Sequence, residues 1–376
     1  MAAGCLFPSG LKSPGGRLSG AAVVVGGGFA ALEIALALRN QRPAIPVTLI
    51  SRETQLTYRP WLIRVPAGGA PPPVIPFARL LKEAGVEVIA SSAAGADIEA
   101  RRVVLDSGTE IEYGQLVVAT GAVADRDRVP GARDHALFPC DIADAAEFAA
   151  RIATSNIHVV VVFGWERPGP GLEYAAWIAA HRPAVQLTAI DGDGTLTRRF
   201  GDRATAHIRN LFERRGAQLI AEGAIERIGE GTVEVGGRVI VAGVIALAAP
   251  LRGSTAWLPP ALLDQRAMLR VDNTMAAGAG VFGIGDVVSV PEGYRLPPAL
   301  RSIQTTASGV ARNVAAALRG NVAKPILRKG GPDMMLPDLA GTAVLVRERR
   351  LLLSGRLPLI LRSSSERRYL RSRKAS

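Results

Sequence analysis

The sequence predicts an α/β fold that consists of two Rossmann-like dinucleotide-binding domains, one inserted into the other, and a small α+β segment at the C-terminus. Three observations predict this fold. A run of valines, a Gly-rich turn and a helical pattern follow one another at residues 23–35, and the same order recurs at residues 159–175. Buried-strand character returns at residues 281–286, beyond the second unit. The first domain is therefore expected to be discontinuous.

The elements follow in chain order from apolar runs punctuated by Gly and Pro. Strands of the first domain are expected at 21–25, 46–51, 86–90, 101–105 and 281–286, with two more within 109–119, the second at 116–119. Its helices are expected at 29–40, 77–84 and 299–319. The second unit is expected to contain a helix at 144–153 and strands at 157–163, 185–190, 217–221, 232–235 and 239–248. A hairpin within 342–353 and a basic amphipathic helix at 357–370 complete the prediction.

These patterns place the domain boundaries. We expect the first domain at residues 20–130 and 251–325 and the second at residues 131–250. The Gly/Pro/Ser-rich residues 1–19 lack the apolar stretch of a secretory signal and are interpreted as a disordered leader. Residues 326–376 are interpreted as a separate basic segment.

Composition excludes several classes of protein. Cys5 and Cys140 are the only two cysteines, so a disulfide framework and a Cys-x-x-Cys redox pair are excluded, which fits a reducing compartment. The four histidines show no metal-ligand spacing, and no metal is predicted. No run of eighteen apolar residues occurs, so no transmembrane helix is expected. We expect a cytoplasmic protein, with peripheral attachment to the inner face of the membrane as an alternative.

The formal charge of +12 is concentrated near the C-terminus, where residues 324–376 hold thirteen Lys and Arg against four Asp and Glu. Leu357, Ile360 and Leu361 beside Arg356 and Arg362 favour a helix that lies on an anionic membrane surface. A solvated surface and a protein contact are the alternatives, and nucleic acid is the less favoured partner. A homodimer is an open alternative.

The first Gly-rich turn has the form G-x-G-x-x-A, with Gly26, Gly28 and Ala31 at its defining positions. The first glycine permits the tight turn, the second lets the backbone approach a pyrophosphate, and the small third residue lets helix and strand pack closely. The helix N-terminus then binds the pyrophosphate. Ser51 ends the next strand, where a ribose-binding acid is usual.

The second turn departs from this pattern. Gly164, Gly169 and Gly171 span a turn with about two extra residues, so a degenerate unit kept for its shape is an alternative to nucleotide binding. Asp191 follows about 20 residues later, at the position of a ribose-binding acid, and a plain turn residue is the alternative.

Two further motifs raise the specificity of the pattern. Thr120-Gly121 ends a strand at the exit from the first domain, and Gly285-Asp286 ends the returning strand. With them the chain resembles the pyridine nucleotide–disulfide oxidoreductase superfamily of flavoproteins with two dinucleotide-binding domains. It looks most like the type II NADH dehydrogenases, because of the segment Thr57 to Leu62 with Arg59, the Pro297-Pro298 helix start and the basic C-terminus.

The resemblance implies FAD as the cofactor of the first domain and NADH as that of the second. Gly26, Gly28, Ala31, Ser51, Arg59, Thr120, Gly121, Gly285 and Asp286 would bind FAD, and Gly164, Gly169, Gly171 and Asp191 would bind NADH. Because the FAD motifs end before it, residues 356–376 are expected to be dispensable for FAD binding.

Glu173 matches the glutamate that the resemblance places near flavin and nicotinamide, where it could relay protons; an acid favoured by the helix dipole is the alternative. Quinone-reducing relatives carry two glutamines on the helix after Pro298. Here Arg301 and Thr305 align with them, and Gln304 is interpreted as a solvated position. Cys140 falls near a cysteine of the sulfide:quinone reductases and is interpreted as a packed thiol.

We therefore expect an FAD-dependent oxidoreductase that passes a hydride from NADH to flavin and electrons to a small acceptor, with quinone as the leading example. A soluble flavin reductase or biosynthetic tailoring enzyme is the second hypothesis, favoured by the missing glutamines. A non-enzymatic FAD-binding interaction protein with a degenerate nucleotide site is the third.

Overall fold

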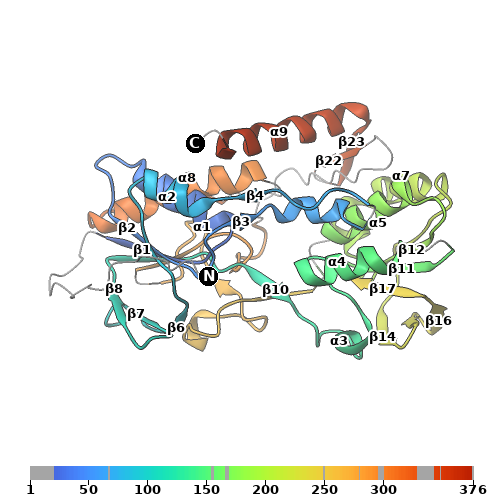
Figure 1. Cartoon of the computed structure of the whole chain (residues 1–376), viewed down its shortest axis with the longest axis horizontal. Coiled ribbons are helices and arrows are strands. Elements are labelled where there is room, and N and C mark those ends of the chain that lie inside the picture. The colour runs from blue at the N-terminus through green and yellow to red at the C-terminus, as the bar shows by residue number, and fades with distance from the viewer. Residues whose placement is uncertain are drawn as a thin grey trace, which may run out of the picture.

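The computed structural model describes residues 21–66, 68–153, 156–165, 169–248, 250–278, 280–294, 300–327, 343–347 and 349–374, and every structural statement below concerns these residues. The expected leader lies outside them. Figure 1 shows an elongated molecule with one α/β layer at each end and a long C-terminal helix lying across both.

The first sheet is parallel throughout, with strand order β20-β9-β1-β2-β5. Its strands are β1 (Ala22–Val25), β2 (Val47–Ile50), β5 (Glu87–Ile89), β9 (Gln115–Val118) and β20 (Val281–Gly283). The helices of this domain are α1 (Phe29–Arg39), α2 (Phe77–Glu83) and α8 (Leu300–Leu318), and α1 packs against α8. Because β20 follows the whole second unit along the chain, the first domain is discontinuous, as the sequence predicts.

Small antiparallel elements surround this sheet. A three-stranded sheet contains β6 (Ala93–Asp97), β7 (Arg102–Leu105) and β8 (Glu110–Glu112). The shorter pairs are β3 (Leu56–Thr57) with β4 (Val74–Ile75) and β19 (Leu269–Arg270) with β21 (Val288–Ser289), and the 3-10 helices are η1 (Arg59–Arg64) and η2 (Pro260–Leu262). Strand β6 was not expected, because its sequence Ala-Ala-Gly-Ala-Asp has no β-branched or aromatic residue.

The second domain contains a parallel sheet with strand order β13-β12-β11-β17. These strands are β11 (His158–Phe163), β12 (Gln186–Asp191), β13 (Gln218–Ile220) and β17 (Val244–Leu247), with helices α3 (Ala132–His135), α4 (Ile142–Arg151), α5 (Gly169–His181), α6 (Thr195–Phe200) and α7 (Asp202–Glu213). An antiparallel sheet of β14 (Ile225–Gly229), β15 (Thr232–Val235) and β16 (Arg238–Val241) adjoins it.

The single strand expected at 239–248 was wrong. Its residues form two strands in different sheets: β16 pairs antiparallel with β15, and β17 pairs parallel with β11. Ala242 and Gly243 separate them, and a Cβ on Gly243 would lie 2.5 Å from the Ile157 side chain. An apolar stretch of sequence does not show where the chain passes from one sheet to another.

The chain crosses between the domains twice, on neighbouring paths. Strand β10 (Ala122–Ala124) leads into the second domain and β18 (Leu251–Gly253) returns from it, and the two pair antiparallel. The two domains are thereby joined by a pair of antiparallel strands.

The C-terminal segment forms the expected hairpin and helix: β22 (Ala343–Arg347) pairs with β23 (Arg350–Gly355), and α9 (Arg356–Lys374) follows. Val344 and Val346 are buried in the core of the second domain, whereas Tyr369 is buried in the core of the first. The segment is therefore packed into both domains (Figure 1).

Candidate functional site

The first Gly-rich turn connects β1 to α1. Gly26 has φ +143°, and a Cβ there would lie 2.3 Å from the Ala119 carbonyl oxygen, so only glycine fits. Gly28 borders open space, with no heavy atom within 4 Å of its built Cβ. No side chain caps the N-terminus of α1, which leaves its first N–H groups available to an anion. Ala31 is buried behind the turn.

The other two motifs of the first domain meet this turn. The hydroxyl of Thr120 is buried and has no hydrogen-bond partner among the described residues, although a buried hydroxyl normally has one. Gly121, with φ +71°, borders open space. Gly285 approaches α1 so closely that a Cβ would lie 2.7 Å from that of Ala30, and the exposed Asp286 follows it. Three separate segments of the chain thus meet at the start of α1.

Ser51 lies beside the same turn but is engaged locally. Its Oγ accepts from the Glu53 N–H at 3.0 Å, and a Cβ on Gly27 would lie 2.5 Å from that Oγ and 2.9 Å from the Glu53 side chain. Glu53 is exposed. A carboxylate thus stands two residues beyond Ser51, in a turn that Ser51 shapes.

Cys140 belongs to this region and not to a distant surface. It is partly buried, and burial raises the pKa of its thiol to about 12, with the nearby Asp286 raising it further and Arg59 opposing. At neutral pH the thiol is protonated and a poor nucleophile. Arg59 itself is exposed at the start of η1.

The second Gly-rich turn keeps the packing geometry of a dinucleotide fold. Gly164 has φ +130°, and a Cβ there would lie 2.6 Å from an Asp193 carboxylate oxygen and 2.8 Å from one of Asp191. A Cβ on Gly171 would lie 2.3 Å from that of Phe163, so Gly171 lets α5 pack on β11. Gly169 begins α5. Residues 166–168, which hold part of the expected insertion, lie outside the described residues.

Asp191 points inward at the end of β12. It has no exposed surface, and its carboxylate accepts from the N–H groups of Thr195 at 3.2 Å and Leu196 at 2.6 Å, which caps α6. Burial raises the pKa of Asp191 to about 7, with a further contribution from Asp193. Asp193 accepts from the Trp165 N–H at 3.0 Å and from Arg198 at 2.9 Å. Both acids brace the turn, and Asp193 is the more exposed.

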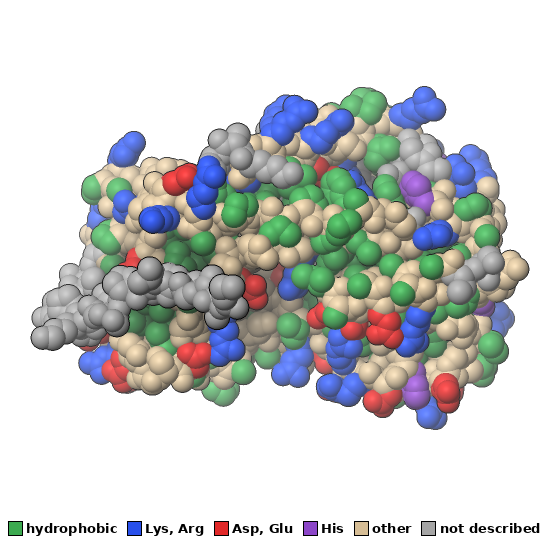
Figure 2. Space-filling view, in the orientation of Figure 1, with side chains coloured by type: hydrophobic (Ala, Val, Ile, Leu, Met, Phe, Trp, Pro, Cys, Tyr) green, Lys and Arg blue, Asp and Glu red, His purple; other side chains and the backbone are tan. Residues whose placement is uncertain are grey.

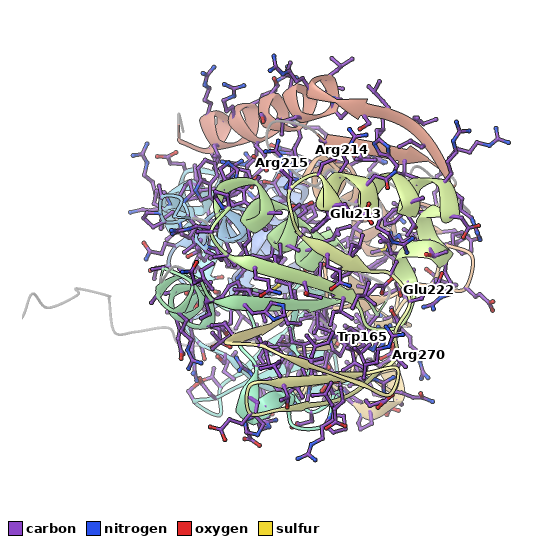
Figure 3. The ribbon with its side chains drawn as sticks, turned by 90° about the vertical axis from the view of Figure 1, so that its right-hand side faces the viewer. Trp165, Glu213, Arg214, Arg215, Glu222 and Arg270 are labelled. Carbon is purple, nitrogen blue, oxygen red and sulfur yellow. The ribbon has the colours of Figure 1, made fainter. Side chains whose placement is uncertain are left out.

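Trp165 is a feature that the sequence analysis did not interpret. It follows Gly164 with φ +52°, an uncommon conformation for a bulky residue. A Cβ on Gly192 would lie 2.7 Å from its ring, so the ring covers the end of β12. Figure 3 views the second domain end-on and labels Trp165 together with Glu222, which follows β13. The only sequence signal was a tryptophan inside a glycine turn.

Glu173 lies on α5 and meets the C-terminal helix. The Nη2 atom of Arg362 donates to its Oε2 at 2.5 Å, and the side chains are 16% and 20% exposed, respectively. Burial alone would lower the pKa of Arg362, but the Glu173 and Glu366 carboxylates raise it above its ordinary value. Arg362, which the sequence analysis counted among the residues of a membrane-surface helix, therefore faces the protein, because a half-buried acid of the second domain binds it.

Gln304, for which a solvated position was the alternative, contacts α1 of the first domain. It is partly buried, and its amide lies 3.4 Å from a carboxylate oxygen of the buried Glu33. Thr305, one of the two aligned positions, is exposed. The side chain of Arg301, the other, lies outside the description.

Neither a metal site nor a membrane-spanning helix occurs among the described residues. No group of three or more His, Cys, Asp or Glu side chains there could hold a metal ion. No helix in the same part of the chain has the length and apolarity needed to cross a bilayer.

Two parallel sheets, each with a Gly-rich turn at its carboxyl edge and joined by paired crossovers, define a two-domain dinucleotide-binding α/β protein. The chain belongs to the pyridine nucleotide-disulphide oxidoreductase family, whose model matches residues 20–311. Membership implies an FAD-dependent oxidoreductase with a nicotinamide dinucleotide as its second cofactor. The open Gly28 and Gly121 positions and the unpartnered Thr120 hydroxyl fit FAD in the first domain.

Two curated relatives are identical to this chain at about a quarter of the aligned positions. The ferredoxin–NAD(+) reductase subunit of a benzene 1,2-dioxygenase system from Pseudomonas putida is 26% identical, over 77% of this chain and 73% of that protein. A chloroplastic/mitochondrial monodehydroascorbate reductase from Arabidopsis thaliana is 27% identical over 56% of this chain, which spans only 44% of that protein's length.

Solved structures show the same fold. The sulfide:quinone oxidoreductase of Aquifex aeolicus superposes with a TM-score of 0.78 at 22% identity, covering 94% of this chain and 91% of that one. NDH2 of Plasmodium falciparum, solved with NADH, gives 0.73 at 14% identity, covering 93% of this chain and 94% of that one. At these identities the likeness shows the fold alone.

Proposed function

We propose that this protein takes a hydride from NADH and passes the electrons to a quinone-type acceptor at an anionic membrane surface. The observation that carries the proposal is the pair of Gly-rich turns, one at the carboxyl edge of each parallel sheet, in domains joined by β10 and β18. That arrangement suits two dinucleotides whose reactive ends meet between the domains.

In the first domain the main chain would do most of the binding. The N–H groups at the start of α1 would bind the FAD pyrophosphate, with Gly28 leaving room for it. The Thr120 hydroxyl would gain a partner, and Asp286 would reach the ribityl hydroxyls. FAD, when bound, supplies the electron transfer between donor and acceptor.

In the second domain an acidic turn would select the donor. Asp191 and Asp193 lie against Gly164, where the ribose of a dinucleotide is expected. A 2′-phosphate would meet the negative charge of Asp193, so NADH is the proposed donor over NADPH. Asp191 would act indirectly, since its carboxylate caps α6.

The surface of α9 and its hairpin supports a membrane site for the acceptor. Large apolar side chains there are 36–59% exposed: Leu352, Leu353, Leu357, Ile360 and Leu361. Arg367, Arg368 and Arg371 line a groove with Ser364 on the same helix. Figure 2 shows Lys and Arg side chains together with hydrophobic ones along this edge of the molecule. Exposed leucines beside arginines suit an anionic lipid surface.

A protein acceptor is the second candidate. Several relatives are named as ferredoxin reductases, and the arginines of α9 would also suit an acidic protein. The exposed leucines favour the membrane, because a soluble ferredoxin does not need them.

The test is anaerobic titration of the FAD-loaded protein with NADH and then NADPH, followed by reoxidation with a water-soluble quinone or a ferredoxin. We expect NADH to bleach the flavin absorbance with a higher kcat/KM than NADPH, and quinone to restore it faster than ferredoxin. A colourless protein that FAD cannot reconstitute would refute the proposal, and so would flavin that neither nucleotide reduces.

A further inference from the structure

The inward face of α9 carries charges that are all matched by partners elsewhere in the chain. Arg362, Glu366, Tyr369 and Arg373 follow one another at spacings of four, three and four residues, which places them on one side of a helix. Each makes a polar contact with a residue of another element. The outward face carries the exposed leucines and arginines described above.

At the N-terminal part of α9 the partners come from two domains. Arg362 binds Glu173 of α5 at 2.5 Å, and its Nε lies 3.6 Å from Glu366. Glu366 in turn accepts from Arg64 of η1 at 2.8 Å. The Arg64 guanidinium lies 3.6 Å above the ring of Trp61 and 5.4 Å from that of Trp177 on α5.

At the C-terminal part of α9 the partner is Glu33 of α1, which is 5% exposed. Arg373 donates to both of its carboxylate oxygens, at 2.7 and 2.6 Å, and the Tyr369 hydroxyl donates at 2.9 Å. Tyr369 also packs against Phe29, the first residue of α1 after the Gly-rich turn, with ring centroids 5.3 Å apart. One helix therefore contacts the helices that follow both Gly-rich turns.

The limited solvent exposure of these side chains means that their contacts restrict where the elements can lie. Buried carboxylates and guanidinium groups are costly unless they are paired, so each charge strongly favours the position of its partner. Glu173 is the fifth residue of α5, just beyond its first turn, so fixing its carboxylate also restrains the N-terminal part of the helix.

We infer that Arg362 is a positioning residue for electron transfer. By binding Glu173, it sets the charge near the start of α5, the helix after the second Gly-rich turn, and the orientation of this helix toward the flavin. This inference rests on the proposed function for its flavin readout. Its structural half, energetic coupling between Arg362 and Glu173, does not depend on that function. A merely stabilising ion pair would show the coupling without any effect on the flavin.

The coupling test uses the full-length FAD-loaded protein and the variants Arg362→Gln, Glu173→Gln and the double variant. Each single variant should lower Tm by about 5 °C, because each removes the ion pair between these two largely buried side chains. The double variant should lose clearly less than the sum of the two. Arg312→Gln, which removes an exposed arginine of α8, is the matched control and should leave Tm unchanged within about 1 °C.

The flavin test measures the midpoint potential and the rate of anaerobic reduction by NADH. Removing the arginine should lower the potential, because the reduced flavin carries negative charge, and removing the glutamate should raise it. The double variant should return toward the wild type. Flavin reduction in Arg362→Gln should slow about tenfold, with the NADH Kd little changed and Arg362→Lys recovering part of the rate.

The outcomes distinguish a positioning role of Arg362 from a merely stabilising ion pair. Opposite potential shifts that cancel in the double variant support the inference. Shifts of the same sign, or none, overturn it, and so do strictly additive losses in Tm. If Arg362→Gln fails to fold, Arg362→Lys carries the same comparison against Glu173→Gln. Failure of wild-type flavin to accept a hydride refutes the proposed function, while the Tm coupling remains measurable.

Discussion

Asp191 combines complete burial with two backbone hydrogen bonds and a neighbouring carboxylate. The hydrogen bonds favour its charged form, whereas burial and Asp193 disfavour that form more strongly, and the pKa rises to about 7. The residue braces the second Gly-rich turn in a way that depends on its protonation.

Stability should therefore depend on pH through Asp191. An acid with a raised pKa binds more protons in the folded than in the unfolded protein between about pH 4 and pH 7, so its contribution falls as pH rises through that window. From pH 5 to pH 8 the loss should be about 3 kcal/mol, since about two pH units lie between pH 5 and the folded pKa and each corresponds to about 1.4 kcal/mol. Asp191→Asn should lack this component.

Thermal unfolding of both proteins at pH 5 and pH 8 measures the difference. The wild type should lose stability relative to Asp191→Asn as pH rises. A difference in Tm that stays constant across this range would mean that Asp191 is ionised throughout.

At the scale of elements, α9 has two faces with different chemistry. Its inner face is fixed to α5, η1 and α1 by ion pairs. Its outer face, with the adjoining hairpin, exposes leucines and arginines. Membrane attachment would therefore not require the helix to leave the protein.

Replacing Leu357, Ile360 and Leu361 together by serine should weaken binding to vesicles rich in anionic phospholipid about tenfold or more, because their apolar surface can no longer enter the interface. Vesicle sedimentation measures this, and wild-type binding should decrease with added salt. Serine at Val239 and Val241, exposed valines of β16, is the matched control. Equal binding by the triple variant and this control would refute a membrane role for α9.

At the scale of the whole molecule, the C-terminal segment joins two cores. Val344 and Val346 belong to the core of the second domain and Tyr369 to that of the first. The expectation that residues 356–376 can be removed without affecting FAD therefore gives way to a different prediction.

Tyr369→Ala should destabilise the protein by about 3 kcal/mol, because a buried aromatic ring and its hydrogen bond to Glu33 are lost. FAD release and loss of helical circular dichroism should shift to lower temperature together, as one transition. Two separate transitions, of which only one moves, would show that the segment does not couple the domains.

Local signals account for what could be predicted from the sequence. A valine strand, a Gly-rich turn and a helix start are adjacent along the chain. The two α/β units, the return of the chain to the first domain near Gly285, and the C-terminal hairpin and helix could therefore be predicted. A Cβ on Gly26 or Gly171 would clash with atoms of a neighbouring segment, so both positions require glycine. The change of sheet near Gly243 and the inward orientation of Asp191 could not be predicted, because they depend on tertiary contacts that the local sequence pattern does not show.

The sequence by itself determined the fold class, the family and the two places where dinucleotides are expected, since each rests on a short contiguous motif. Only the tertiary structure decided which side of the C-terminal helix faces the protein. Arg362 meets Glu173 across 189 residues, and Arg373 meets Glu33 across 340. From its sequence, a helix with leucines and arginines is expected to be amphipathic toward solvent or lipid. Only the carboxylates of Glu33 and Glu173, on other elements, determine which of its arginines point inward.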